Sequence, residues 1–372
     1  MVSANYIKDK PSLLGQEYFR VASNGHKMFS GAYFNYSLVP FLLISSYDPV
    51  IITAFFVFLN LLTGFVVYKV AGKIFGKNVG IISAVLFLFN DLMIYHSFFI
   101  WNYNFLPFLG ILAFYFSYLF FRKRSQQSIF LLGLIGGVGV SLQILFLPFT
   151  LLIYIVNILK SKNKVGDTIL FILGAVLGNL PMILFDFRHD FYHLRTLSQY
   201  FIDTLHGKSD AGFAYYYLLP LWPLAAASGA WILSKFNKIT MLVLILVYLF
   251  VSLSSSKISW NLPTGMPKGL TVRDINAASR IIAEDADGNF NVSEVLDFDK
   301  RGYVLRYFIE FKYGKKPLPE TEYENIERLY VLSPKDYNFD KSGVWEIDAG
   351  GPYKTDLLND IGQGYAVYRL EK

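Results

Sequence analysis

Long apolar segments are the feature that most constrains the fold of this chain. A helix needs about 20 mostly apolar residues to cross the hydrocarbon core of a bilayer. Eight segments meet or approach this length: 49–70, 79–97, 103–121, 128–146, 147–160, 167–185, 213–234 and 238–255. The shortest of them is 147–160. The sequence therefore predicts a polytopic α-helical membrane protein with about eight transmembrane helices.

The distribution of charged residues divides the chain into two parts. Of the 372 residues, 17% are charged, whereas an average soluble domain has about a quarter. Residues 1–255 contain 18 Lys/Arg and 9 Asp/Glu, and the much shorter stretch 256–372 contains 16 and 19. We therefore predict an outer segment over 1–48, a transmembrane domain over 49–255 and a soluble extracytoplasmic domain over 256–372.

Residues 256–372 have the pattern of a small α/β domain. Alternating apolar residues predict strands at 290–295, 328–333, 343–348 and 364–370. Apolar residues at helical spacing predict helices at 271–285 and 300–314. No Gly-rich phosphate loop, HExxH or GxSxG motif occurs in this part. We therefore expect an accessory or acceptor-binding domain.

Basic loops predict the orientation in the membrane. Lys and Arg gather in every second loop between the apolar segments, at 69–77, 122–124, 160–164 and 235–238. The positive-inside rule places such loops in the cytoplasm. Residues 186–212 and 256–372 are then predicted on the outer side of a plasma (inner) membrane. The net charge of +6 reflects these loops, and no nucleic-acid partner is expected.

The same alternation places residues 1–48 outside, yet no signal peptide precedes them. Either residues 31–47 form a ninth span, or a leading transmembrane helix is missing from this chain. Asn35, Ser37 and Pro40 make 31–47 more typical of an interfacial helix. We therefore expect the second explanation, a truncated first outer loop.

The densest cluster of ionisable residues near a predicted membrane surface is DFRHDF, residues 186–191. An arginine between carboxylates suits a phosphate clamp, because its guanidinium donates two parallel hydrogen bonds. Asp186, Arg188, His189 and Asp190 are therefore candidate substrate-binding residues. The alternative is a cap at the membrane edge, in which Arg188 pairs with Asp186 or Asp190.

Amides beside aromatic rings mark a second candidate region, near the uncharged loop 98–102. Asn102 and Asn104 next to Trp101 are typical of a sugar site, in which amides bind hydroxyl groups and a ring stacks on the sugar. Gln143 lies near the outer end of the fourth apolar segment, where its amide needs hydrogen-bond partners. The alternatives are a solvated turn for the loop and helix packing for Gln143.

The chain contains no cysteine. A disulfide, a thiolate metal site, an iron–sulfur cluster and a cysteine nucleophile are thereby excluded. No metal site and no cofactor are predicted.

Several segments, in this order along the chain, resemble a known family. They are KPSLLGQ (10–16), GAYFNYSLVPFL (31–42), SFFIWNYNFLPFL (97–109), GVGVSLQ (137–143) and LGNLPMILFDFRHDF (177–191). Over residues 10–260 the chain resembles the bacterial GT-C membrane glycosyltransferases of the protein-mannosyltransferase and aminoarabinose-transferase-like type. The most specific piece is the P-x-x-x-F-[DE]-x-R-H-[DG]-F run at 181–191. Tyr33 and Tyr36 match part of a tyrosine-rich run of the family. Gln143 matches the glutamine of another family motif, but the histidine that follows in that motif is missing here.

The resemblance implies inverting transfer of a sugar from a polyprenyl-phosphate-linked donor to a glycan, lipid or protein acceptor at the outer face of the membrane. It also implies a catalytic carboxylate directly ahead of the KPSLLG segment, which corresponds to a position upstream of Met1. Among the acidic residues of this chain, Glu17 is the fallback candidate for this role. Such a base deprotonates the acceptor hydroxyl while Arg188 stabilises the leaving phosphate. Two alternatives are a catalytically inactive scaffold and a transporter or flippase of lipid-linked substrates.

Overall fold

The structure is a computed structural model of the chain. It describes residues 7, 10–21, 25–208, 215–255, 269–296 and 300–372. The chain divides into two compact units, Met1–Ile258 and Ser259–Lys372, which we describe separately. Parts of the predicted outer segment (1–6, 8–9 and 22–24) and the first two residues of the predicted span 213–234 lie outside the described residues.

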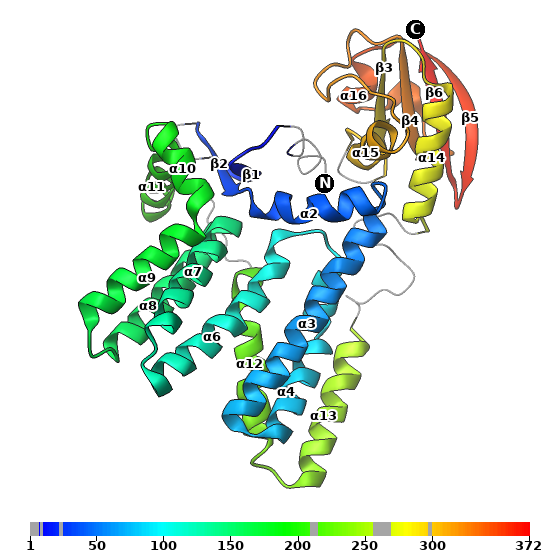
Figure 1. Cartoon of the computed structure of the whole chain (residues 1–372). Coiled ribbons are helices and arrows are strands. Elements are labelled where there is room, and N and C mark those ends of the chain that lie inside the picture. The colour runs from blue at the N-terminus through cyan, green and yellow to red at the C-terminus, as the bar shows by residue number, and fades with distance from the viewer. Residues whose placement is uncertain (1–6, 8–9, 22–24, 209–214, 256–268, 297–299) are drawn as a thin grey trace. The chain divides into compact units, whose positions relative to one another are not determined.

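The first unit is mainly a bundle of apolar helices (Figure 1). In chain order these are α3 (Pro49–Phe75), α4 (Lys77–Leu88), α5 (Asp91–Ser97), α6 (Leu106–Lys123), α7 (Gln126–Leu142), α8 (Leu147–Leu159), α9 (Lys164–Gly178), α10 (Leu180–Arg188), α11 (Tyr192–Leu205), α12 (Trp222–Leu233) and α13 (Lys238–Leu253). Short 3-10 turns precede α6, α8 and α12, at Asn102–Phe105, Ile144–Phe146 and Tyr215–Leu221.

Helices long enough to cross a bilayer are present, but fewer than predicted. Within the described part of the chain, three are long and apolar enough: Pro49–Phe75, Asn102–Lys123 and Tyr215–Leu233. The count rises to five if the bent pairs α4–α5 and α9–α10 each form one span. The remaining apolar helices, including α7, Ile144–Leu159 and α13, are shorter. A mostly helical protein with candidate membrane spans is thus confirmed.

Two of the predicted spans, 79–97 and 167–185, are broken helices. The axis bends by 59° between α4 and α5 and by 76° between α9 and α10. Asn90 starts α5, because its side chain accepts hydrogen bonds from the N–H groups of Leu92 and Met93. Pro181 lies in the first turn of α10, where its missing N–H costs no helical hydrogen bond. The second break matters most, because it turns α10 across the end of the bundle.

Glycines let α7 and α9 pack with their backbones in contact. Gly133 and Gly137 on α7 face α9, and Gly174 and Gly178 on α9 face α7. A Cβ atom at Gly137 would lie 2.2 Å from the carbonyl oxygen of Ala175. Small residues spaced four apart are the usual means by which membrane helices approach this closely.

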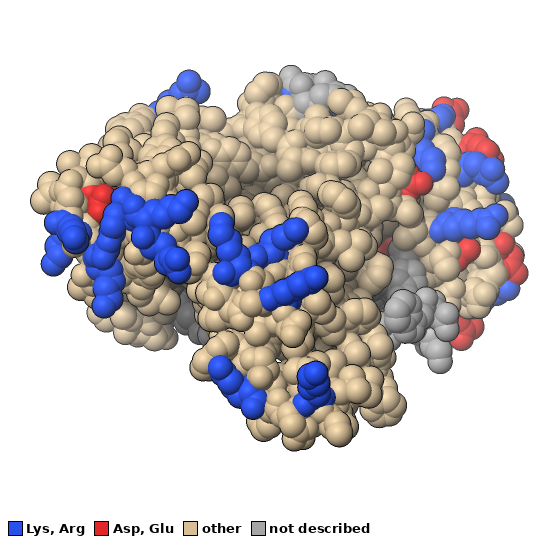
Figure 2. All heavy atoms as spheres, turned by 60° about the horizontal axis from the view of Figure 1, so that its bottom comes forward, with Lys and Arg blue, Asp and Glu red and all other residues tan. Residues whose placement is uncertain are grey.

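The four basic loops lie at one end of the first unit, which we call the basic end. They are the turns between α3 and α4, α6 and α7, α8 and α9, and α12 and α13. Two of these loops touch, since the Arg124 guanidinium donates a hydrogen bond to the carbonyl of Lys160. Figure 2 shows Lys and Arg spread over this end with few acidic residues between them.

The opposite end of the bundle carries the β-hairpin and α2. Strands β1 (Leu14–Val21) and β2 (Lys27–Gly31) pair antiparallel, and α2 (Tyr33–Ile44) follows directly. The helix predicted within residues 31–47 is therefore present, and it is too short to be a span by itself. Gly31 allows β2 to approach α7 closely, because a Cβ atom there would lie 2.0 Å from the Ser141 Oγ and 3.1 Å from the Ser141 carbonyl oxygen.

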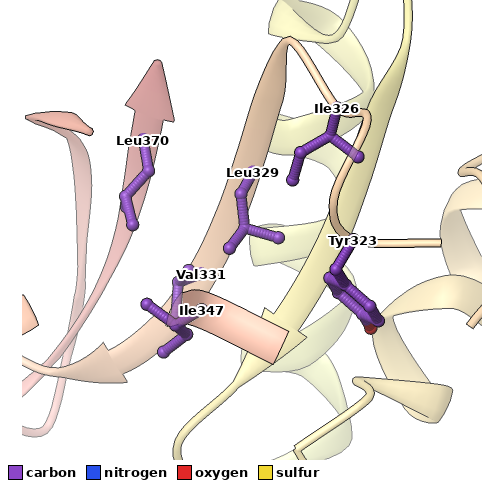
Figure 3. Close-up of a cluster of buried hydrophobic side chains, with 6 residues drawn as sticks. All are labelled: Tyr323, Ile326, Leu329, Val331, Ile347 and Leu370. Carbon is purple, nitrogen blue, oxygen red and sulfur yellow. The ribbon is translucent and has the colours of Figure 1, made fainter. Parts of the chain in front are cut away.

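The second unit is a four-stranded sheet with helices packed on it. The strand order is β3 (Phe290–Glu294), β4 (Arg328–Pro334), β6 (Tyr365–Glu371), β5 (Lys354–Gly362), and only β3 and β4 run parallel. Helices α14 (Val272–Asp285) and α15 (Tyr303–Phe311) contact each other. A buried cluster fills its core (Figure 3): Tyr323, Ile326, Leu329, Val331, Ile347 and Leu370.

The predicted strands at 290–295, 328–333 and 364–370 and the two predicted helices of this unit are confirmed. The predicted strand at 343–348 is wrong, because residues Trp345–Asp348 form the short helix α16. Val344 and Ile347, three residues apart, pack on the core while Trp345 is exposed, which is helical rather than alternating burial. The fourth strand is instead β5, an exposed edge strand.

Candidate functional site

A cavity of about 270 Å³ lies at the end of the first unit opposite the basic end. It is bounded by β2, the last turn of α7, the start of α8, and the helices α10 and α11. The lining side chains are mostly apolar: Phe29, Val140, Ile144, Leu147, Met182, Ile183, Phe187, Phe191, Leu194 and Leu197. Three polar residues, Asn179, Asp186 and His193, complete the lining with Gly31. Its volume is slightly below the range of about 300–1,000 Å³ typical of small-molecule sites.

The break between α9 and α10 places Asn179 at the cavity. The Asn179 N–H donates to the carbonyl of Ala175 and so ends α9. Its side-chain Oδ1 is buried and has no hydrogen-bond partner among the described residues. An unsatisfied buried acceptor is costly. A donor group of a bound ligand can satisfy this oxygen.

Asp186 holds the start of α11. Its Oδ1 accepts a hydrogen bond of 2.7 Å from the N–H of His193, and its Oδ2 accepts one of 3.2 Å from the N–H of Leu194. The chain reverses between the two helices with Asp190 and Phe191 in the left-handed region, at φ 51° and 57°. A carboxylate at a helix N-terminus also interacts favourably with the helix dipole. Asp186 therefore has a structural role as well as a place in the cavity wall.

His193 ties α11 to the hairpin. Its Nε2 lies 3.1 Å from the carbonyl oxygen of Phe29. Because a carbonyl only accepts, Nε2 must carry the proton in the neutral ring. Burial lowers the pKa of His193 below its ordinary value, while the Asp186 carboxylate and the Phe29 carbonyl act in the opposite direction. The imidazole is therefore neutral at physiological pH.

This pKa predicts an acid-sensitive contact between α11 and β2. The pKa of His193 is lower in the folded protein than in the unfolded chain, so the unfolded chain binds more protons. The free energy of unfolding therefore falls as the pH drops below about 6.5. We expect the melting temperature of the full chain to decrease more between pH 7.5 and 5.5 than that of His193→Gln, whose amide still donates to Phe29. Equal decreases in the two proteins contradict the prediction.

Three members of the DFRHDF run lie outside the cavity lining. Arg188, His189 and Asp190 are all exposed. His189 stacks on Phe185 at 4.2 Å, and its Nδ1 is 2.9 Å from the Phe185 carbonyl oxygen. Among the described residues, the Arg188 guanidinium has no ion pair or hydrogen bond. The predicted pairing of Arg188 with Asp186 or Asp190 is therefore not found in this structure.

The amides of the second candidate region are bound to backbone carbonyls. Asn102 is 2% exposed, and its Nδ2 donates to the carbonyl of Leu142 at the end of α7. Asn104 donates to the carbonyls of His96 and Phe99, at 2.9 and 2.7 Å. Trp101 packs against Tyr103 with a centroid distance of 4.1 Å. Asn104 thereby holds the turn after α5, whereas Asn102 links the turn before α6 to the end of α7. Neither asparagine lines the cavity described above.

The remaining predicted residues lie around the same end of the bundle. Gln143 is 2% exposed and ends α7, directly before Ile144 of the cavity wall. Tyr33 and Tyr36 are on α2, where Tyr33 is half-buried and Tyr36 is exposed. Glu17 on β1 forms an exposed ion pair with Lys27 on β2, with an N–O distance of 3.0 Å. None of the four lines the cavity.

A search of the described residues for metal ligands finds no group of three or more His, Asp or Glu side chains that could hold an ion. The cavity wall contains three polar side chains. Their chemistry is one amide, one carboxylate and one imidazole.

Sequence reasoning missed His193, Asn179 and the part of the wall that comes from β2. A signal existed for Asn179, because an asparagine two residues before a proline inside an apolar segment indicates a helix break. No local pattern indicates that Phe29 and His193 meet, since they are 164 residues apart in the chain.

No model of a known protein family matches the chain, and neither a curated protein nor a solved structure matches it.

Proposed function

We propose that this chain is a glycosyltransferase of the plasma membrane that takes its sugar from a polyprenyl-phosphate-linked donor and transfers it to a glycan, lipid or protein acceptor at the outer face. The observation that supports this most is the cavity opposite the basic end, with mostly apolar walls and three polar groups. An amphiphile whose polar head lies at the level of the lipid headgroups matches such a site. A polyprenyl-phosphate sugar is an amphiphile of this kind, because its scissile bond joins the sugar to the lipid phosphate.

The chemistry requires a base for the acceptor hydroxyl and a cation for the leaving phosphate. Arg188 supplies the cation in this proposal, since it is exposed one residue from the cavity-lining Phe187 and has no partner among the described residues. Asp186 is engaged at the start of α11, so we assign it to binding rather than proton abstraction. Glu17 is the first carboxylate to test as the base. No covalent intermediate is needed when the configuration inverts.

The test is a transfer assay on the full chain in liposomes that contain radiolabelled polyprenyl-phosphate sugars. Release of polyprenyl phosphate that depends on the protein supports the proposal. Movement of intact donor between the two leaflets without cleavage supports the flippase alternative, and donor binding without movement or cleavage supports the scaffold alternative. Loss of activity in Glu17→Gln identifies Glu17 as the base.

The orientation belongs to the same proposal. The eight predicted spans require that α7, the Ile144–Leu159 segment and α13 also cross the membrane. All four basic loops then lie on one side of the membrane. The positions of these loops at one end of the bundle favour this arrangement. We expect a reporter active only in the cytoplasm to work when fused after Lys77 or Lys164. A reporter active only outside is expected to work after Lys372. A cytoplasmic signal at Lys372 contradicts the orientation and, with it, the external site.

A further inference from the structure

Helix α11 is amphipathic in the inverted sense. His193, Thr196 and Asp203 recur on one face of the helix, and all three are buried in the first unit. On the opposite face most side chains are apolar and exposed, with Leu194 at 52%, Phe201 at 62% and Leu205 at 71%. The exposed Ser198 also lies on this face, where its hydroxyl donates to the carbonyl of Leu194. A surface helix in water shows the reverse arrangement, in which the apolar face is buried and the polar face is solvated. Some apolar medium must therefore cover the outward face of α11.

This outward face continues an apolar surface that belongs to a candidate membrane span. Phe187 on α10 is 69% exposed, and its ring lies 5.4 Å from that of Phe191, which directly precedes α11. Helices α9 and α10 are together long and apolar enough to form one bent span. Phe187, Phe191 and Leu194 are all exposed and lie together in the wall of the cavity.

Cations border this apolar face. Arg195 lies on the flank of α11 and Lys208 follows its end, and both are exposed. Lys and Arg at the edge of an apolar surface place their charges among lipid phosphates while their stems stay in the apolar zone. Such charges favour a lipid surface over an apolar groove of another protein as the cover.

We propose that α11 is an interfacial helix that lies in the plane of the bilayer, with Leu194, Phe201 and Leu205 in the acyl-chain boundary and its polar face on β2. Helices of this type bury their apolar face about 5–10 Å into the headgroup boundary. The helix then forms one wall of the cavity from within the leaflet, so the cavity opens at the headgroup level. The inference rests on the membrane location of the first unit and does not require sugar transfer.

The absence of cysteine from the chain gives a clean test by single-cysteine labelling of the full protein. Phe201→Cys and Leu205→Cys place an environment-sensitive fluorophore on the proposed lipid face. Leu357→Cys on β5 of the second unit is the matched aqueous control, because this leucine is 61% exposed, about as much as Phe201. Leu61→Cys on α3 is the reference for a position inside the bilayer, because this leucine is 53% exposed near the middle of a candidate span.

The labelled proteins are reconstituted in phosphatidylcholine–phosphatidylglycerol vesicles, with or without doxyl-labelled phosphatidylcholine. We expect blue-shifted emission at positions 201 and 205 that the doxyl lipid quenches and aqueous iodide does not. Position 357 is expected to behave in the opposite way. Two positions on one face keep the inference testable if one variant fails to fold.

Iodide quenching at 201 and 205 overturns the inference, because the face is then in water. Emission that is blue-shifted but protected from both quenchers also overturns it, since the face is then covered by protein, such as a second copy of the chain. If position 61 is not quenched by the doxyl lipid either, the membrane location of the whole unit is wrong, and the inference fails with it.

Discussion

Replacing Gly133 and Gly137 together by alanine is expected to separate α7 from α9 and to remove the cavity wall that α7 provides. A Cβ atom at Gly133 would lie 2.0 Å from the Phe171 carbonyl oxygen, and one at Gly137 would lie 2.2 Å from that of Ala175. Both obstacles are backbone atoms, so no side chain can rotate away. Overpacking costs about 1–3 kcal/mol at each site, which equals or exceeds the gain of about 1 kcal/mol in helix propensity from glycine to alanine.

Gly229→Ala on α12 is the matched control for this prediction. The nearest atom that a Cβ there meets is Leu86 Cδ1 at 3.6 Å, an ordinary contact. The same substitution should therefore stabilise the protein, by about 0.5–1 kcal/mol. The measurement is the free energy of unfolding of the full chain in mixed micelles, from a titration with sodium dodecyl sulfate. If all these alanines stabilise the protein alike, α7 and α9 do not pack as described.

The helical bundle could be predicted from the sequence, but the breaks in its helices could not. Apolar segments predicted the helical bundle correctly, because a long run of apolar residues has few folds open to it other than a membrane helix. The two breaks were not predicted, although Pro181 indicates one of them. Hydropathy alone does not distinguish a straight span from a bent pair, since both contain the same residues.

The small α/β unit was predicted where strands are buried and missed where one is exposed. Strand β4 is buried along most of its length, so its apolar run is easy to recognise. Strand β5 lies at the sheet edge and is mostly exposed, and its sequence KTDLLNDIG has no clear alternation. The segment 343–348 shows the opposite failure, because a short apolar run fits one helical turn as well as a strand.

The candidate site was predicted only in part, for a reason of chain topology. DFRHDF indicated Asp186, which lines the cavity and caps α11. The rest of the wall comes from β2 and from the end of α7, and contacts between segments so distant in the chain leave no local pattern. Asn102 and Asn104 were candidate sugar ligands, with a turn as the alternative, and in the structure their amides donate to backbone carbonyls near the start of α6 and at the end of α7.

In the proposed glycosyltransferase, changing Arg188 to lysine is expected to lower the rate of sugar transfer by about 10²–10³-fold, the usual cost of losing one contact to the charge of a transition state. The planar guanidinium binds two phosphate oxygens at once, and an ammonium group does not replace this geometry. The loss cannot be attributed to unfolding, because Arg188 is exposed and makes no ion pair or hydrogen bond with a described residue. Its melting temperature is therefore expected to stay at the parent value.

Arg195→Lys is the matched control, since Arg195 is also exposed, lies seven residues further along the chain and is absent from the cavity lining. We expect Arg195→Lys to transfer sugar at nearly the parent rate, because a cation that only faces lipid phosphates needs charge and not a planar fork. Equal activity of both lysine variants contradicts the phosphate clamp. Arg188 is then a cation of the membrane surface like Arg195, and the leaving phosphate must be stabilised by another group.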